Sequence, residues 1–594
     1  MKNTINERIK ALRDVMKRES LDAFIFPSTD PHNGEYIPEH WEARKWISGF
    51  GGSAGTAVVT MNEAALWTDS RYFIAAEEQL SGTEFKLMKL KMPGTPTISG
   101  WLGRVLATAK SPQVGIDGMV MSRNEVEAFK EELRAEGGIT LRTNLDPLKE
   151  IWTDRPQIPE DKVFIQPLEY AGVSCRDKVA IVRKKLAEKH ADGILVTALD
   201  DVAWMLNMRG NDVHCNPVFV SYLLIDRKNV SLYINKEKLT PEVEKYLKEE
   251  GVTVYEYESI GKGLEKYPEY NILMDPDEVN YTLYNKVKCN VISAPSPVRY
   301  LKVVKNDVEI KGFKSAMLKD GIAMVKFLKW IKPAVKAGGQ SELSVTEKLY
   351  NLRAAQPLFK GISFDTIAGY ADNGAIVHYE ADETTDRKLE PKGFLLLDSG
   401  AQYTDGTTDI TRTIPLGELT EEEKKVYTLV LKGHIKIERC VFPEGASGTQ
   451  LDILAREDMW RNGYSFMHGT GHGVGSYLNV HEGSHQIRME WKPAPLVEGM
   501  TVTDEPGIYL EGKFGVRIEN TLLITHKWTN EFGKFLTFES LTLAPIDTRP
   551  IVKELLSKDE IDWLNEYHKR VCDTLAPHLD EEEKEWLRNE TAAI

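Results

Sequence analysis

The spacing of apolar residues in the first third of the chain predicts two copies of one helix–strand pattern. Residues 4–20 repeat apolar side chains with the period of an amphipathic helix, and residues 21–27 follow as a short apolar strand. The same order returns at residues 179–190 and 192–197. We therefore predict two related α/β domains in tandem, and the period is too long and divergent for a solenoid.

Two proline-bearing stretches divide this pattern from the rest of the chain. They lie around residues 152–168 and 293–297, and clusters of this kind are typical of linkers. The predicted fold class is α/β (α+β), in three parts. Their predicted bounds are residues 1–157, 158–304 and 305–594.

The third part begins with a strong helix signal. Asn306 and Glu309 have the spacing of a capping box, and the helix is predicted to run to about Lys332. Beyond about Arg549 the apolar pattern again indicates helices. These tail helices are predicted at residues 552–556, 561–575 and 581–587.

The composition excludes several classes of function. The chain has 594 residues and a net charge of −15, which argues against a nucleic-acid binder or a binder of anionic membranes. Five scattered cysteines without a CxxC pair suit a reducing compartment and exclude a cysteine zinc cage. The polar N-terminus is no secretory signal, and no apolar run is long enough to span a membrane. We expect a cytoplasmic protein.

Two aspartates lie in a predicted hairpin of the third part. An apolar run, residues 394–397, ends on Asp398, and a β-prone run, residues 407–414, carries Asp409. Buried carboxylates on adjacent strands repel each other, so a bound cation is the simplest neutraliser. The alternative is a pair of turn-capping aspartates. Asp405 lies in the intervening turn, where we expect it to need no charged partner.

Histidines gather further along the same part. Four of the thirteen in the chain lie among alternating glycines, which leave room for side chains to crowd around a ligand. They are His468, His472, His481 and His485. The spacing of His468 and His472 resembles a zincin pair, but the glutamate of HExxH is missing and the glycines disfavour a helix. His378, between apolar residues, is either a core histidine or a catalyst.

Two glutamates follow β-rich runs near a short predicted hairpin. Glu505 ends one run, and strand alternation places Arg517 and Glu519 on one face of another. Such glutamates either face solvent or line a site.

A charge sum favours a metal site. The four carboxylates of Asp398, Asp409, Glu505 and Glu519 balance two divalent ions, and His472 adds a neutral nitrogen. Oxygen-dominated ligation with one imidazole suits Mn²⁺ better than Cu²⁺ or a thiolate-loving metal. Two ions roughly 3.5–4 Å apart can share a hydroxide and polarise a carbonyl, which is hydrolase chemistry.

The motifs DSGAQYTDGTTDITRT, HGTGHGVG, HEG, DEPGIY and GVRIEN together resemble those of the pita-bread metallopeptidases, and most closely the aminopeptidase P (Xaa-Pro aminopeptidase) family. The likeness extends to SGFGGSAGT and WTDSRYF near the N-terminus and to the helical tail. It implies two creatinase-like N-terminal α/β domains followed by a pita-bread catalytic domain with a helical extension. It also implies a cytosolic homodimer.

The resemblance assigns roles to individual residues. Asp398, Asp409, His472, Glu505 and Glu519 match the metal ligands of the family. Among these, Asp409 and Glu519 would bridge both ions. Substrate-handling positions match His378, His468, His481 and Arg71. For Arg71, which follows a predicted strand, a structural ion pair is the alternative.

The implied activity is a metallo-aminopeptidase that releases the N-terminal residue when proline is second, by attack of a hydroxide that bridges the two ions. The ions are expected to be Mn²⁺, although Zn²⁺ and Co²⁺ fit the same ligands. His378 and His481 would donate to the tetrahedral oxyanion, and Glu505 would pass a proton to the leaving nitrogen. Arg517 would hold a metal carboxylate in place.

Other functions fit the sequence less well. A prolidase shares the ligands but cleaves only Xaa-Pro dipeptides, and the additional middle domain and tail favour aminopeptidase P. A methionine aminopeptidase would not need two N-terminal domains. A creatinase does not need the five ligands, and non-catalytic relatives have lost them. The expected partners are peptides that begin Xaa-Pro, with neither nucleic acid nor membrane.

Overall fold

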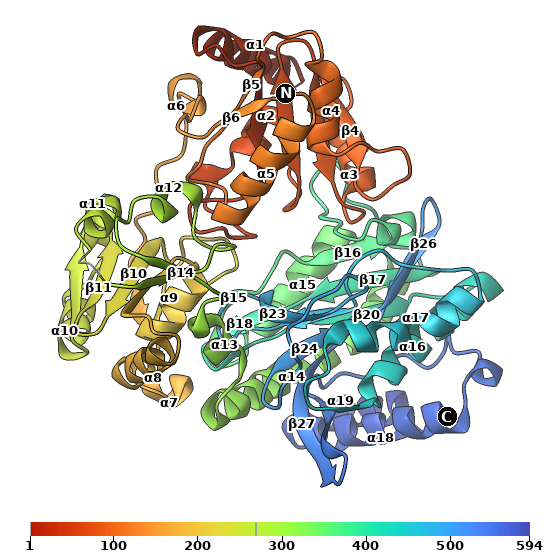
Figure 1. Cartoon of the computed structure of the whole chain (residues 1–594). Helices are drawn as coiled ribbons and strands as arrows, with labels where there is room; N and C mark the ends of the chain where they lie inside the picture. The colour runs from red at the N-terminus through yellow and green to blue at the C-terminus, as the bar shows by residue number, and fades with distance from the viewer. Residues whose placement is uncertain (1, 268–269) are drawn as a thin grey trace. The chain divides into compact units, whose positions relative to one another are not determined.

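The chain folds into two compact units (Figure 1). The structure is a computed structural model that describes residues 2–267 and 270–594. Unit 1 comprises Met1–Gln166 and Val173–Val298, and unit 2 comprises Pro167–Gly172 and Arg299–Ile594. The predicted division after residues 157 and 304 stays a prediction.

Unit 1 contains two six-stranded sheets, and the first has the strand order β4-β3-β2-β1-β5-β6. Its strands are β1 (Ala23–Phe26), β2 (Thr56–Thr60), β3 (Ala64–Thr68), β4 (Phe85–Lys89), β5 (Gln113–Ile116) and β6 (Thr140–Arg142). The pairs β1–β2 and β2–β3 are antiparallel, whereas β1–β5, β5–β6 and β3–β4 are parallel. Its helices are α1 (Lys2–Arg18), α2 (Ala43–Ser48), α3 (Phe73–Leu80), α4 (Ile98–Val105), α5 (Arg123–Ala135) and α6 (Leu148–Ile151).

The second sheet repeats the first strand for strand, in the order β12-β11-β10-β8-β13-β14. Its strands are β8 (Gly193–Val196), β10 (Ser221–Asp226), β11 (Val230–Ile234), β12 (Val252–Tyr255), β13 (Ile272–Met274) and β14 (Val291–Ser293). Each pair has the same direction as its counterpart. The predicted tandem repeat is therefore confirmed. Around this sheet lie α8 (Cys175–Glu188), α9 (Leu199–Leu206), α10 (Pro241–Glu249), α11 (Ile260–Glu265), α12 (Tyr281–Tyr284) and the short pair β7 (Phe164–Ile165) and β9 (Met208–Arg209).

Unit 2 is built on a long helix, α14 (Asp307–Ala337), which begins with the predicted capping box between Asn306 and Glu309. The helix does not end at Lys332 as predicted but continues through Pro333 for one more turn. A proline that close to the C-terminus removes one hydrogen bond without stopping the helix. The other helices are α7 (Leu168–Ala171), α13 (Pro297–Val303), α15 (Glu342–Ala354), α16 (Glu421–Glu438), α17 (Gly448–Arg461), α18 (Lys558–Leu575) and α19 (Glu581–Glu590).

The strands of unit 2 form several small antiparallel sheets. One contains β16 (Ile367–Tyr370), β17 (Phe394–Ser399) and β20 (Ile410–Pro415), and another contains β15 (Phe359–Ile362), β18 (Ala401–Tyr403) and β19 (Gly406–Thr407). The third contains β21 (Val441–Pro443), β24 (Thr501–Asp504), β27 (Asn520–Asn530) and β28 (Gly533–Ser540). Two pairs complete the unit: β22 (Gly471–Gly473) with β23 (Glu482–Ile487), and β25 (Gly507–Leu510) with β26 (Phe514–Arg517).

The predicted hairpin of the third part is present, since β17 and β20 pair antiparallel with Asp398 opposite Thr411. The small hairpin β18–β19 is inserted between them. The expectation for Asp405 is wrong: its side chain is buried and accepts hydrogen bonds of 2.6 and 2.7 Å from Lys319 Nζ of α14. A buried carboxylate is costly unless it is paired, whatever its place in a turn.

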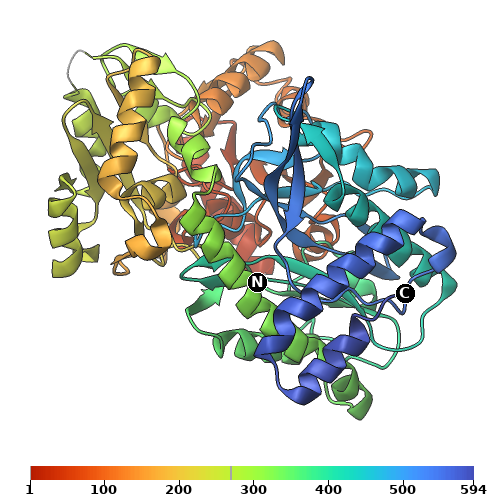
Figure 2. The ribbon, with the colours of Figure 1, turned by 90° about the horizontal axis from the view of Figure 1, so that it is seen from below.

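The predicted tail helices correspond to a 3₁₀ turn at Lys553–Leu555 and to α18 and α19. Figure 2 shows α18 and α19 alongside α14. The largest apolar cluster of unit 2 joins α16, α17 and α18 to β24 and β27. Within residues 2–267 and 270–594, no helix is both long and apolar enough to cross a membrane.

Candidate metal centre and active site

The hairpin β17–β20 brings the two aspartates into the interior of unit 2. Asp398 lies in β17, and Asp409 directly precedes β20. Counted over the whole residue, backbone included, Asp398 is only 7% exposed and Asp409 only 4%. Asp398 Oδ1 is buried and has no hydrogen-bond partner among the residues that the structure describes. An orphaned buried carboxylate oxygen is the kind of atom that a metal ion would satisfy.

The glycines around His472 let its imidazole point at the carboxylates. His472 Nδ1 lies 2.8 Å from the carbonyl oxygen of Gly473, which can only accept a hydrogen bond. The proton therefore resides on Nδ1, and Nε2 carries the lone pair with which a neutral imidazole binds a metal ion. Nε2 lies 3.5 Å from both Asp409 Oδ2 and Glu505 Oε1.

The two glutamates adjoin the paired strands β24 and β27, since Glu505 directly follows β24 and Glu519 directly precedes β27. The backbone N–H of Glu505 donates to Thr470 O at 2.7 Å, and that of Glu519 donates to Thr411 O at 3.1 Å. Thr411 Oγ1 also donates to Glu519 Oε2 at 2.7 Å. Ligand atoms of Asp409, His472 and Glu519 all lie within 4.8 Å of one another.

Burial and mutual repulsion make the group strongly attract positive charge. Burial first, and then the charge of Asp398, raises the pKa of Asp409 well above its ordinary value. Burial and the charge of Asp409 do the same to the pKa of Glu519. A carboxylate in this state takes up either a proton or a cation. Hard oxygen donors with one imidazole fit Mn²⁺-type ions, so the residues present fit a divalent metal centre.

Arg517 contacts this centre and links it to a tyrosine. Its Nη2 donates to Asp398 Oδ2 at 2.7 Å, and both side chains are buried. Its Nη1 donates to Tyr509 Oη at 2.7 Å, and His468 Nε2 lies 2.8 Å from the same oxygen. The predicted substrate-handling His468 is thus connected to Asp398 through Tyr509 and Arg517.

The other two predicted histidines also lie in unit 2: His481 is beside His472, and His378 follows a residue that Arg517 contacts. The ring of His481 stands 4.3 Å from that of His472, edge to face at 72°. His378 is half-buried in a turn after the 3₁₀ helix Ala371–Ala375. Its neighbour Val377 accepts a hydrogen bond from Arg517 Nη2 at 3.5 Å.

Arg71 belongs to unit 1, whereas the centre lies in unit 2. Its Nε and Nη2 donate to the two carboxylate oxygens of Asp69 at 2.9 and 2.8 Å, and Glu35 lies 3.6 Å away. The ion pair considered as an alternative is therefore present, and a role for Arg71 in substrate binding stays a prediction.

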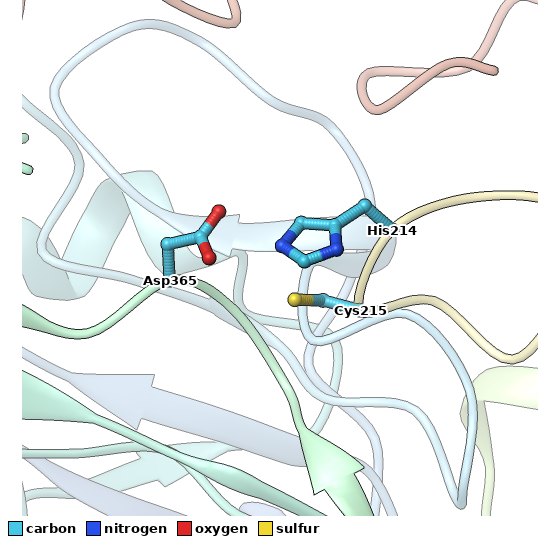
Figure 3. A group of neighbouring side chains, drawn as sticks. All are labelled: His214, Cys215 and Asp365. Atoms are coloured by element: carbon cyan, nitrogen blue, oxygen red, sulfur yellow. The ribbon is translucent and has the colours of Figure 1, made fainter. Parts of the chain in front are cut away.

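Sequence reasoning missed residues that support the ligands. Thr411 and Tyr509 give no signal by themselves, although each lies within four residues of a predicted ligand. Two polar residues adjacent to ligands, Asp504 and Asn520, were also missed. Figure 3 draws a further group, in which His214 and Cys215 belong to unit 1 and Asp365 to unit 2. Because the group divides between the units, we assign no site to it.

Comparison with known proteins accounts for the whole chain. Residues 311–526 match metallopeptidase family M24, and residues 534–594 match its C-terminal region. Residues 8–146 and 154–309 match creatinase/prolidase N-terminal domains. Aminopeptidase P1 of Lotus japonicus is 38% identical over the full length of both chains. This chain belongs to metallopeptidase family M24.

Two further relatives are similar to this chain over nearly its full length. A probable Xaa-Pro aminopeptidase P of Aspergillus niger is 39% identical over 99% of both chains. The X-prolyl aminopeptidase of Caenorhabditis elegans, whose structure is described as that of a cytosolic enzyme with a di-nuclear active site, is 35% identical over the full length of both chains, with a TM-score of 0.95. These matches confirm the predicted fold of two creatinase-like domains followed by an M24 catalytic domain.

Proposed function

We propose that this M24 chain is an aminopeptidase that releases the N-terminal residue from peptides with proline in second position. The observation that carries the proposal is the convergence of three buried carboxylates, a fourth that is partly exposed, and one imidazole nitrogen in unit 2. They come from Asp398, Asp409, His472, Glu505 and Glu519. Full-length relatives named aminopeptidase P support the specificity for proline.

These five side chains would hold two divalent ions, most simply Mn²⁺, as the di-nuclear site of the Caenorhabditis elegans enzyme suggests. Asp409 and Glu519 would be among the residues that hold the ions, in keeping with the burial and mutual repulsion that raise both of their pKa values. Bound ions would supply a water of lowered pKa and polarise the scissile carbonyl.

Glu505 is suited to move protons because its side chain is 19% exposed, compared with 5% for Asp409 and 10% for Asp398. It takes the proton of the attacking water and delivers it to the proline nitrogen, which as a tertiary amide carries none. His481, beside His472, donates to the oxyanion together with His378.

Substrate binding and assembly complete the proposal. Arg71 and His468 would contact the peptide, and Arg517 would keep Asp398 oriented. The protein would act as a cytoplasmic homodimer, without nucleic acid or membrane as a partner. Light scattering on the purified chain tests the oligomeric state.

A peptide panel on the Mn²⁺-loaded protein tests the activity. We expect hydrolysis of Arg-Pro-Pro to arginine and Pro-Pro, no cleavage of the dipeptide Gly-Pro, and loss of activity after dialysis against a chelator. Glu505→Ala should abolish the reaction, whereas Glu511→Ala, at an exposed carboxylate in the loop after β25, should not. Cleavage of Gly-Pro alone would show a prolidase instead, and full activity of Glu505→Ala would refute the role of that residue.

A further inference from the structure

The strand residues next to the two metal-binding glutamates are polar and fully buried. Asp504 precedes Glu505, Asn520 follows Glu519, and both are 0% exposed. They lie opposite each other where β24 and β27 pair. Because successive side chains of an extended chain point to opposite faces, Asp504 and Asn520 point away from the metal centre.

Helix α16 meets both of them. His434 and Glu438 are spaced i, i+4, so they lie on one face of the helix, and they are 0% and 4% exposed. His434 Nδ1 lies 3.0 Å from Asp504 Oδ2 and 3.3 Å from the backbone oxygen of the same residue. Asn520 Nδ2 donates to Glu438 Oε1 at 2.7 Å and lies 3.4 Å from His434 Nε2. One turn of helix thus contacts both strand ends.

Ser540 and Arg412 form further hydrogen bonds to this group of buried polar residues. Ser540 Oγ donates to Glu438 Oε1 at 2.9 Å. Arg412 Nη2 donates to Asn520 Oδ1 at 2.9 Å, and its Nη1 donates to the backbone oxygen of Glu519 at 2.7 Å. Glu438 Oε1 thus accepts two hydrogen bonds, whereas neither carboxylate oxygen of Asp504 accepts one from the residues that the structure describes. The contact of Asp504 with His434 is the 3.0 Å approach of their charged or polar atoms.

The free-energy cost of burying these ionisable side chains requires an explanation. Buried ionisable groups stabilise a core less than apolar side chains of similar size, so packing alone does not account for His434 and Glu438. What buried polar contacts between a helix and two strand ends can provide is a fixed geometry. The strand partners in these contacts, Asp504 and Asn520, are the residues joined directly to Glu505 and Glu519.

We propose that His434 and Glu438 are positioning residues that fix, through Asp504 and Asn520, the backbone from which Glu505 and Glu519 bind the metal ions. The inference rests on the proposed metal centre. Its consequence is that metal affinity depends on a helix face that touches neither ion.

The test compares Mn²⁺ binding by calorimetry, on metal-free full-length protein at 25 °C, with thermal unfolding of the same samples. His434→Leu should weaken Mn²⁺ binding at least about tenfold, the effect of losing a partner that orients a ligand. His434→Asn, which keeps an N–H donor near the position of Nδ1, should remain within about threefold of wild type. Val430→Ala is the matched control, because Val430 is buried one turn earlier on the same helix.

The outcomes distinguish the proposed positioning role of His434 from a general effect of altering helix α16. Tighter binding by Asn than by Leu at position 434, with Val430→Ala unchanged, supports the inference. Equal Mn²⁺ affinity of wild type and His434→Leu overturns it, as does an equal loss in Val430→Ala. If His434→Leu does not fold, Glu438→Leu and its conservative counterpart Glu438→Gln give the same comparison at the other contact. Folded wild-type protein that binds no Mn²⁺ would refute the proposed metal centre itself.

Discussion

A buried ion pair next to His481 offers a quantitative test of how unit 2 holds its active site. Lys305 lies just before α14, and its Nζ pairs with the carboxylate of Glu482, the first residue of β23. Both side chains are 1% exposed. The backbone N–H of Lys305 also donates to Gly499 O at 2.9 Å. The pair therefore ties the start of α14 to the strand that follows His481.

Lys305→Met removes the cation and leaves the carboxylate of Glu482 buried without it. Breaking a buried pair in this way costs about 3–5 kcal/mol, because the remaining charge has lost its solvation. Unit 2 has about 300 residues, so its unfolding entropy of about 0.6 kcal/mol per kelvin converts this loss to about 5–8 °C in Tm. The double variant with Glu482→Met should recover most of the loss, since replacing both charges by apolar groups is nearly neutral.

Calorimetry and urea unfolding of the two single variants and the double variant form a double-mutant cycle. Activity on Arg-Pro-Pro should follow the same order as stability, because His481, the proposed oxyanion donor, is adjacent to Glu482. If the double variant is as unstable as Lys305→Met, the loss comes from packing of the lysine stem and not from breaking the ion pair. The argument about the ion pair would then be wrong.

Three further outcomes follow from the same structure. His481→Ala should lower kcat on Arg-Pro-Pro by about 10²–10³ with little change in KM, as expected for an oxyanion donor, and an unchanged kcat would exclude that role. Asp405→Asn should lower the free energy of unfolding by a few kcal/mol in urea, since it strands Lys319, while Lys319→Met with Asp405→Leu should restore it. Burial lowers the pKa of His568 from 6.5 to about 4, so its contribution to stability is complete above pH 6.5 and is lost as the pH falls through 4. His568→Gln, which keeps an acceptor for the N–H of Ile546, should therefore lose about 2 kcal/mol less than wild type between pH 7.5 and pH 5 in urea titrations.

The sequence was most informative where a feature repeats or is local. The tandem N-terminal domains were visible because each copy places a helical stripe before a short apolar strand, and the two sheets have the same strand order. The start of α14 was visible because a capping box needs only residues 306–309. The end of α14 was not visible, because tertiary packing carries the helix past Pro333.

Contacts between distant segments were beyond such reasoning. Asp405 was expected to be solvated because turns are polar, but its partner Lys319 comes from α14, 86 residues earlier. The candidate metal ligands could be named because an acid that interrupts an apolar strand is costly and needs a partner. The network behind them could not, because nothing in the pattern of α16 shows that His434 faces Asp504.

The residues around each candidate ligand explain how an apolar interior accommodates four carboxylates. On the metal face, Thr411 donates to Glu519, and the hydroxyl of Thr503 accepts the backbone N–H of His472 at 3.1 Å. Threonine keeps the β-branched shape that strands favour and adds a hydroxyl that fixes a ligand. On the opposite face, Asp504 gives the strand a polar contact with α16. Each ligand strand is therefore held from both sides, so the carboxylates stay close enough together to repel one another strongly until cations neutralise them.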